Sequence, residues 1–116
     1  MTKAFTISLM AVGLTTLASL PATAASGAAA WNQTYPQSDG SPARSCASCH
    51  NADLTKAGQH ATTGKSIEPL APSVNPQRLT DQKKVEKWLR RNCRWTLGRE
   101  CNSAEKAEFI SYIKSQ

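Results

Sequence analysis

Residues 46–50 read Cys-Ala-Ser-Cys-His, and this stretch carries the strongest chemical signal in the chain. Two cysteines three residues apart, followed directly by a histidine, form the C-x-x-C-H pattern of covalent c-type haem attachment. Cys46 and Cys49 would each add to one vinyl group of the porphyrin, and His50 would be the proximal axial ligand of the iron. The stretch therefore predicts one covalently bound haem c. The iron supplies the chemistry, and the protein sets the other axial ligand and the pocket.

Two other cysteine sites compete with this interpretation. A thioredoxin-like redox pair also uses Cys-x-x-Cys, but it requires a βαβ pattern, which this sequence does not show. A zinc site is the stronger alternative, because Cys93 and Cys101 would complete a set of four ligands. The spacing of these two cysteines is unlike that of a usual zinc knuckle, and the compartment inferred next does not favour such a site.

Residues 1–24 have the features of a secretory signal peptide. Lys3 supplies the positive start, an apolar run follows, and Ala-Thr-Ala at residues 22–24 is a typical cleavage site. The run is short and contains many Thr, Ser and Gly residues, so we do not expect it to span a membrane. We expect cleavage near Ala24 and export to the periplasm, where c-type haem is attached and disulfides persist.

The chain is basic, with 14 Lys and Arg against 8 Asp and Glu and a net charge of +6. The excess is concentrated in residues 83–99, where Glu86 is the only acidic residue. The segment is either a solvated helix face or a docking surface for an acidic redox partner, such as another c-type or a membrane b-type cytochrome. We expect no nucleic acid partner for an exported haem protein. The basic residues of the segment are Lys83, Lys84, Lys87, Arg90, Arg91, Arg94 and Arg99.

The sequence shows no repeats and no strand alternation, so the predicted class is all-α. Short helices are expected at residues 25–30 and 46–52. Thr80 is the expected N-cap of a longer helix that ends near residue 92. A last helix is expected from Asn102 or the following serine to about Lys114, with Glu at the third helical position of a capping box.

Residues 55–76 are predicted to form a long irregular loop around one edge of the haem, because three prolines interrupt them. In the helix that follows, Val85, Trp88 and Leu89 share one apolar face, and Asn92 is the next position on that face. Trp88 and Leu89 are expected to wall the haem pocket. A backbone carbonyl at residues 67–69 is expected to accept the ring N–H of His50. The residues expected to meet the haem propionates, from their charge, are Lys65, Arg78 and Arg91.

Cys93 and Cys101 are not needed for haem attachment, and in an oxidising compartment we expect them to pair. The bridge would join the last two helices and stabilise the fold by roughly 2–3 kcal/mol. It is either a structural staple or a constraint on its neighbour, Asn92.

The second axial ligand is an open question at the level of residues. Methionine is the common choice in electron carriers, but Met1 and Met10, the only two, are lost with the signal peptide. Three possibilities remain. His60 could give a bis-histidine haem, the site could stay vacant or hold water, or Asn92 could lie over the iron. A surface role for His60 and a helix C-capping role for Asn92 are the simpler interpretations.

From Ser45 to the C-terminus, the chain closely resembles the sphaeroides haem protein family of small high-spin c-type cytochromes. This resemblance covers most of the predicted mature chain and is more specific than the haem motif alone. Residues 25–44 match poorly, and one extra residue near His60 lengthens the following loop. The matching stretches are SCASCH at residues 45–50, ADLTKAGQ at 52–59, TGK at 63–65, PLAPS at 69–73, VEKWL at 85–89, RNC at 91–93 and GREC at 98–101.

The resemblance implies a class I cytochrome c fold for a haem domain of residues 45–116, with the Cys93–Cys101 disulfide of the family. It also implies that Asn92 ligates ferric iron and is released on reduction, which opens the site to oxygen or nitric oxide. The expected function is therefore small-ligand binding coupled to electron transfer. The alternatives are a simple electron carrier with a closed low-spin haem and a small haem reductase or oxidase. An enzyme is less expected, because no convincing distal acid–base pair is present.

Overall fold

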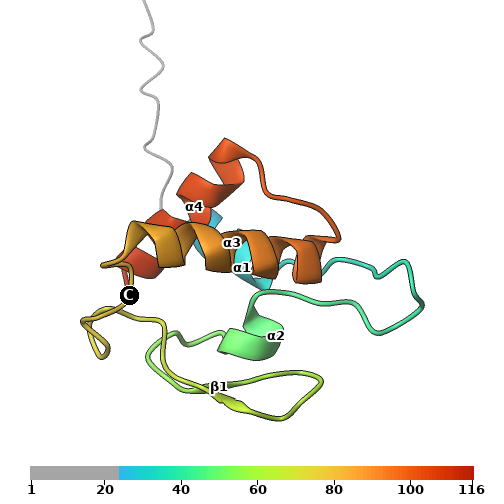
Figure 1. The fold of residues 1–116 in the computed structure, drawn as a ribbon, viewed down its shortest axis with the longest axis horizontal. Helices are drawn as coiled ribbons and strands as arrows, with labels where there is room; N and C mark the ends of the chain where they lie inside the picture. Colours follow the sequence, from blue (N-terminus) through green and yellow to red (C-terminus); the bar gives the residue numbers. More distant parts are fainter. Residues whose placement is uncertain (1–23) are drawn as a thin grey trace, which may run out of the picture.

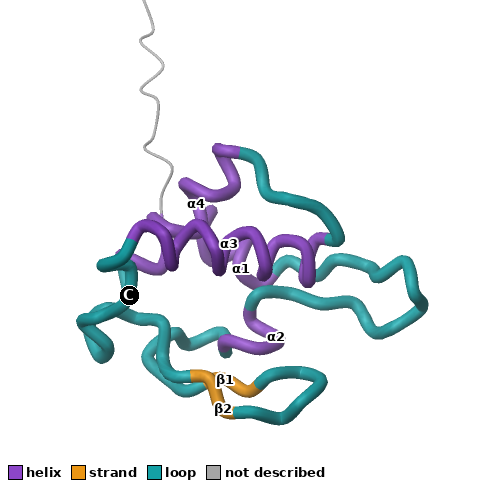
Figure 2. Tube along the Cα trace, viewed as in Figure 1, coloured by secondary structure: helices purple, strands orange, loops and turns teal. Residues whose placement is uncertain are grey.

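The computed structural model describes residues 24–116, so the predicted signal peptide lies outside the described residues except for Ala24. Helices dominate the described part, as predicted, and one small hairpin accompanies them (Figures 1 and 2). No helix among residues 24–116 is long and apolar enough to cross a membrane. The elements in chain order are α1 (Ala24–Asn32), α2 (Ala47–His50), β1 (Gly58–Gln59), β2 (Ser66–Ile67), α3 (Gln82–Leu97) and α4 (Ser103–Lys114).

The core forms where α1 packs against α4. Gly27 permits this close packing, because a Cβ on it would lie only 2.7 Å from Cβ of Tyr112. Trp31, at the end of α1, is 3% exposed, and its ring centroid lies 6.0 Å from Tyr112 and 6.5 Å from Phe109. The N-terminal helix is thus longer than the short helix expected at residues 25–30. The buried hydrophobic residues are Trp31, Leu54, Ala71, Cys93, Cys101, Phe109, Tyr112 and Ile113.

Helix α3 begins one residue later and ends five residues later than predicted. Asp81 is its N-cap, because the Asp81 carboxylate accepts a hydrogen bond from the backbone N–H of Lys84 at 3.2 Å. The helix continues through Asn92 to Leu97, and Gly98 terminates it in the left-handed conformation with φ of 76°. Asn92 is therefore an interior helical residue, and a C-capping role for it is excluded.

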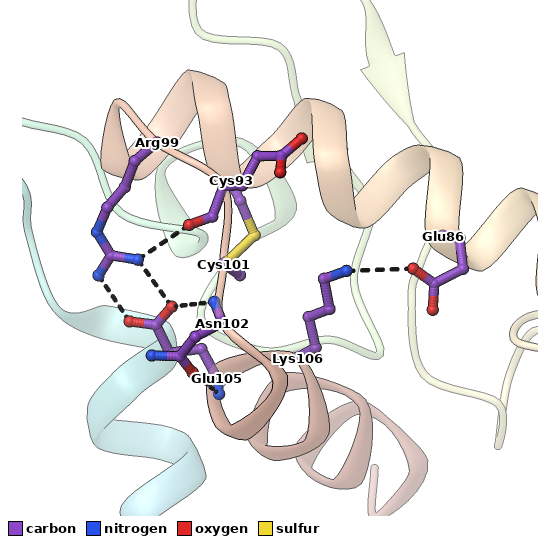
Figure 3. The surroundings of a disulfide bond; sticks show 8 residues. Glu86, Cys93, Arg99, Cys101, Asn102, Glu105 and Lys106 are labelled. Atoms are coloured by element: carbon purple, nitrogen blue, oxygen red, sulfur yellow. Dashed lines mark hydrogen bonds and ion pairs between the residues drawn. A yellow bond between two sulfur atoms is a disulfide. The ribbon is translucent and has the colours of Figure 1, made fainter.

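Helix α4 has the predicted capping box. The Asn102 side chain accepts from the backbone N–H of Glu105, the Glu105 carboxylate accepts from the backbone N–H of Asn102, and both distances are 2.9 Å. Arg99 adds an ion pair to the same carboxylate at 2.7 Å (Figure 3). The expected disulfide joins Cys93 in α3 to Cys101, with the two Cα atoms 5.6 Å apart. The bridge ties α3 to the start of α4.

The segment predicted to be an irregular loop contains the antiparallel hairpin β1–β2, with Gly58 opposite Ile67. Each strand has only two residues, so an alternation of apolar and polar residues along it is too short to be recognised in the sequence. The pairing continues into the turn, where the backbone N–H of His60 donates to the carbonyl of Lys65 at 2.8 Å. The strand β1 lies against α2, so the hairpin covers the helix that carries the haem motif.

Candidate haem-binding site

The Cys-x-x-Cys-His stretch forms a single helical turn. Ser45 and Ser48 start it, because each side-chain oxygen accepts the backbone N–H of the other residue, at 2.9 and 3.1 Å. Asn51 ends it in a positive-φ conformation of 76°, so the helix is shorter than predicted. Cys46 and Cys49 are unpaired and half-buried. The turn therefore presents two free thiols and His50 within one short element, as covalent haem attachment requires.

His50 has the surroundings of a neutral imidazole ligand. Its ring lies 5.8 Å from the ring of Trp31. Burial, with a smaller contribution from the Arg78 guanidinium, lowers the pKa of His50 to about 4. The ring is thus uncharged near pH 7, which is the form that binds a metal. Its Nδ1 is the one buried side-chain nitrogen or oxygen without a hydrogen-bond partner among the described residues.

The hydrogen bond predicted from His50 to a carbonyl of residues 67–69 is absent from this structure, and two of these carbonyls accept from other side chains. The Pro69 carbonyl accepts from Arg78 Nε at 3.0 Å and from Asn75 Nδ2 at 3.2 Å. The Glu68 carbonyl accepts from Arg78 Nη2 at 2.9 Å. Arg78, nine residues along the chain from Pro69, thus bonds two of the three carbonyls that the prediction named.

The two attachment cysteines differ in environment. Burial raises the pKa of the Cys46 thiol to about 11, so this thiol stays protonated at neutral pH. The sulfur of Cys49 accepts the backbone N–H of Ala61 at 3.4 Å, which brings the hairpin turn against the second attachment point. The hairpin also approaches closely at Gly58, where an added Cβ would lie 2.8 Å from Cα of His50. Backbone contact thus holds α2 and the hairpin together.

Helix α3 carries an apolar face that protein atoms cover only in part. Val85 and Leu89 are half-buried, whereas Trp88 is 51% exposed. Asn92 is half-buried on the same face, and no side-chain hydrogen bond among residues 24–116 involves its carboxamide. Together with the free thiols and the partnerless nitrogen of His50, this incompletely covered face fits a large apolar planar group such as haem.

The predicted propionate contacts do not form one cluster. Lys65 is exposed in the turn between β1 and β2, and Arg91 is exposed on α3 with its guanidinium carbon 5.4 Å from the centre of the Trp88 ring. Arg78 is half-buried and holds the two backbone carbonyls described above. Nothing in these contacts singles out one of the three as a propionate partner.

His60 lies at the hairpin turn, half-buried against α3. Its Nδ1 accepts the backbone N–H groups of Thr62 and Thr63, each at 3.2 Å, and its ring centroid lies 5.8 Å from that of Trp95. Arg44 covers the Trp95 ring at 3.7 Å. Sequence reasoning missed the contacts among Arg44, Trp95 and His60, because these residues come from three segments that are far apart in the chain.

A cavity of about 950 Å³ lies between α2 and the hairpin, and Cys49 and His60 belong to its lining. Its lining includes neither His50 nor Asn92, so this cavity does not contain the expected axial positions. The zinc alternative fails on different grounds. Cys93 and Cys101 are joined to each other, and residues 24–116 contain no cluster of three or more potential His, Cys, Asp or Glu ligands.

Comparison with known proteins places the chain among c-type cytochromes. Cytochrome c-type protein SHP of Cereibacter sphaeroides is 47% identical over 105 residues, which cover 90% of this chain and 79% of that protein. Cytochrome c'' of Methylophilus methylotrophus is 45% identical over 71 residues, which cover 61% of this chain and 49% of that protein. A family model described as a domain of unknown function, DUF1924, matches residues 18–113.

Solved structures agree with the sequence relatives. The structure of oxidized SHP, described as an oxygen-binding cytochrome c, superposes with a TM-score of 0.72 and 47% identity, covering 83% of this chain and 84% of that chain. The crystal structure of oxidized cytochrome c'' from Methylophilus methylotrophus gives a TM-score of 0.72 at 37% identity and covers 81% of this chain and 76% of that chain. The predicted cytochrome c fold and covalent haem are thereby confirmed. The chain belongs to the DUF1924 family and to the family of c-type cytochromes that includes SHP.

Proposed function

We propose that this chain is a periplasmic high-spin cytochrome that binds a small diatomic molecule and couples this binding to electron transfer. Cys46 and Cys49 attach the haem, His50 is the permanent axial ligand, and Asn92 is a releasable second ligand. When bound, the haem iron supplies a centre that cycles between ferric and ferrous states and accepts a small ligand such as oxygen or nitric oxide. The description of SHP as oxygen-binding supports this choice of ligand class.

The position of Asn92 carries the proposal. Its carboxamide is half-buried in the interior of α3, on the face of Trp88 and Leu89, without a hydrogen bond to residues 24–116. The carboxamide is neither fully buried nor bonded to another protein group in residues 24–116, so it is accessible to a group bound on this face of α3. An amide oxygen is a hard, weak donor. It suits ferric iron and is easily given up on reduction.

The disulfide restricts movement of the backbone at Asn92. Its neighbour Cys93 is 3% exposed and is bonded to Cys101, so the backbone at this point of α3 is anchored to the start of α4. Displacement of the whole helix turn is therefore disfavoured. Release of Asn92 takes place by rotation of its side chain, which leaves the helix in position and the distal side open.

The variant Asn92→Ala tests this proposal, with Asn32→Ala as the matched control. Asn32 is exposed at the end of α1, and its side chain bonds only the Ala28 carbonyl, at 2.9 Å. We expect Asn92→Ala to change the ferric absorption and EPR spectra and to speed carbon monoxide binding in the ferrous state. The control should change neither. An unaltered ferric spectrum together with an unaltered binding rate would contradict the role of Asn92. A low-spin ferric spectrum lost in His60→Ala would instead indicate a closed electron carrier.

The exposed face of α3 is the proposed docking surface for the redox partner. Of its cations, Arg94 is paired with Glu100 at 2.8 Å, and the neighbouring acid Glu86 is paired with Lys106 at 3.3 Å. The remaining cations have no ion-pair partner among residues 24–116, so they are free to attract an acidic surface of another c-type or a membrane b-type cytochrome. Reduction by such a partner should slow as ionic strength rises. The exposed cations are Lys83, Lys84, Lys87, Arg90, Arg91 and Arg94.

Export is tested separately. If residues 1–24 are a signal peptide, the protein recovered from the periplasm begins at Ala25 and carries haem. A cytoplasmic, uncleaved and haem-free product would contradict both the localisation and the conditions for attachment.

A further inference from the structure

Two side chains of the loop between α1 and α2 hold the last turn of α3 (Figure 1). An α-helix leaves its final carbonyl groups without helical partners, so other groups must satisfy them. Here the Trp95 carbonyl accepts from Arg44 Nη1 at 3.1 Å. The Thr96 carbonyl accepts from Gln37 Nε2 at 3.0 Å. The Arg44 guanidinium also lies over the Trp95 ring, with its carbon 3.7 Å from the ring centre. We call Gln37 and Arg44 the α3 clamp.

The loop that carries the α3 clamp is ordered by its own hydrogen bonds. Tyr35 and Arg44 exchange both backbone hydrogen bonds, at 2.7 and 3.0 Å. Gln37 Nε2 also donates to the Tyr35 carbonyl at 2.9 Å. Arg44 Nη2 also donates to the Ser41 hydroxyl at 3.0 Å. The two side chains therefore extend from a braced backbone, and the Arg44 charge lies at the end of α3 where the helix dipole favours a cation.

The α3 clamp joins the haem motif to the helix that carries Asn92. Arg44 lies two residues before Cys46, and Trp95 lies three residues after Asn92 within α3. Residues three apart lie within one turn of an α-helix, so Asn92 and Trp95 move together. The disulfide at Cys93 fixes this turn to the start of α4. The clamp fixes the same turn to the segment that leads into the attachment cysteines.

The hairpin reaches the same tryptophan from the other side of the motif. The His60 ring centroid lies 5.8 Å from that of Trp95. The next residue, Ala61, donates its backbone N–H to Cys49 Sγ at 3.4 Å. Segments that precede and follow the Cys-x-x-Cys-His turn thus meet at Trp95. Helix α3 packs only weakly on the other described elements, so these side-chain contacts contribute much to its placement.

We propose that Arg44 and Gln37 are positioning residues that hold Asn92 at a fixed place relative to the haem motif, and that they thereby keep the distal site closed in the ferric state. The inference rests on the proposed role of Asn92 as a releasable ligand. An amide oxygen is a weak ligand, and small displacements of a positioned group have large effects on what it does. Without the clamp, Asn92 competes less well with a small molecule for ferric iron, and ligand binding is no longer tied to reduction.

The test is the affinity of the ferric holoprotein for nitric oxide, a neutral probe that a change of protein charge neither attracts nor repels. We expect Arg44→Gln to raise this affinity about tenfold, because a charged hydrogen bond and the contact with Trp95 are lost. Gln37→Ala removes one neutral hydrogen bond with no change of charge and should raise the affinity about threefold. Lys114→Gln, a control of equal charge change at an exposed position of α4, should leave it unaltered.

Two further readouts distinguish positioning from a general loss of structure. In the Asn92→Ala background, neither clamp variant should change the affinity for nitric oxide, because the competing ligand is gone. Backbone amides in the last turn of α3 should exchange with solvent faster in Arg44→Gln, whereas those of α4 should exchange as in the wild type. Wild-type affinity in either clamp variant, or the same increase in the Asn92→Ala background, overturns the inference. Failure of the proposed function looks different, because Asn92→Ala alone would then leave this affinity unaltered.

Discussion

Replacing Gly58 with alanine should loosen the hairpin from the haem-motif helix. Gly58 lies in β1 against the backbone of α2. An added Cβ would overlap the carbonyl oxygen of Cys49 and would lie 2.8 Å from Cα of His50. These are backbone atoms of the helix turn that carries the attachment motif, so no rotamer change can relieve the overlap. The strand or the helix must shift.

The size of the effect follows from these contacts. Ordinary contacts of a Cβ begin near 3.4 Å, so the separation of 2.8 Å from His50 Cα must grow by at least 0.6 Å, and the nearer carbonyl oxygen of Cys49 must move further. Forcing such a shift in a packed region costs about 1–3 kcal/mol. Alanine also restricts the unfolded chain, which offsets about 0.4–1 kcal/mol, since Gly58 is not in the left-handed region. We expect the free energy of unfolding to fall by about 1–2 kcal/mol.

Denaturant unfolding of the holoprotein measures this fall, and Gly98→Ala is the matched control. Gly98 has φ of 76° and no atom within 4 Å of an added Cβ, so its replacement causes backbone strain without overlap. Strain of this kind costs about 1–2 kcal/mol. Stability alone therefore does not separate the two variants. Circular dichroism in the haem absorption band does, because only Gly58 touches the element that carries His50. A Gly58→Ala protein with wild-type stability and a wild-type haem band would refute the reasoning.

Two further perturbations test the periphery of the site. Replacing Cys93 and Cys101 together by serine should lower the free energy of unfolding by about 2–3 kcal/mol, because the bridge closes a short loop with a sequence separation of 8; a denaturation midpoint equal to that of the wild type would exclude a stabilising bridge. The hydrogen bond from the Arg99 side chain, with a second from the Asn102 backbone, lowers the pKa of Glu105 to about 2. The contribution of the ionised Glu105 to the free energy of unfolding is thus present above pH 4.5 and is lost as the pH falls toward about 2. Glu105→Gln should reduce the loss of stability between pH 4.5 and about 2 by at most about 1 kcal/mol, because Arg99 is 54% exposed and solvent screens the pair. A loss of stability in this range identical to that of the wild type would contradict the assignment.

The features that sequence analysis predicted correctly depend on residues close together in the chain. The attachment motif and the capping box of α4 are local patterns, and the structure contains both. The end of α3 was misplaced because a polar residue, Asn92, interrupts the apolar face, although the true terminator Gly98 follows six residues later. The hydrogen bond predicted for the His50 ring is absent from the structure for another reason. Which donor bonds the Pro69 carbonyl depends on tertiary contacts, here those of Arg78 and Asn75, which no local pattern records.

The two halves of α3 are fixed by different means, and this bears on how the haem contributes to the fold. The C-terminal half is bound by the disulfide at Cys93 and by the Arg44 side chain, which donates to the Trp95 carbonyl at 3.1 Å. The N-terminal half has the exposed Glu86–Lys106 pair, and such pairs contribute at most about 1 kcal/mol. Protein packing does not supply the rest, because α3 packs only weakly on the other described elements. We therefore expect the haem to cover the N-terminal half of α3 and to order it, whereas the disulfide holds the C-terminal half, which carries Asn92.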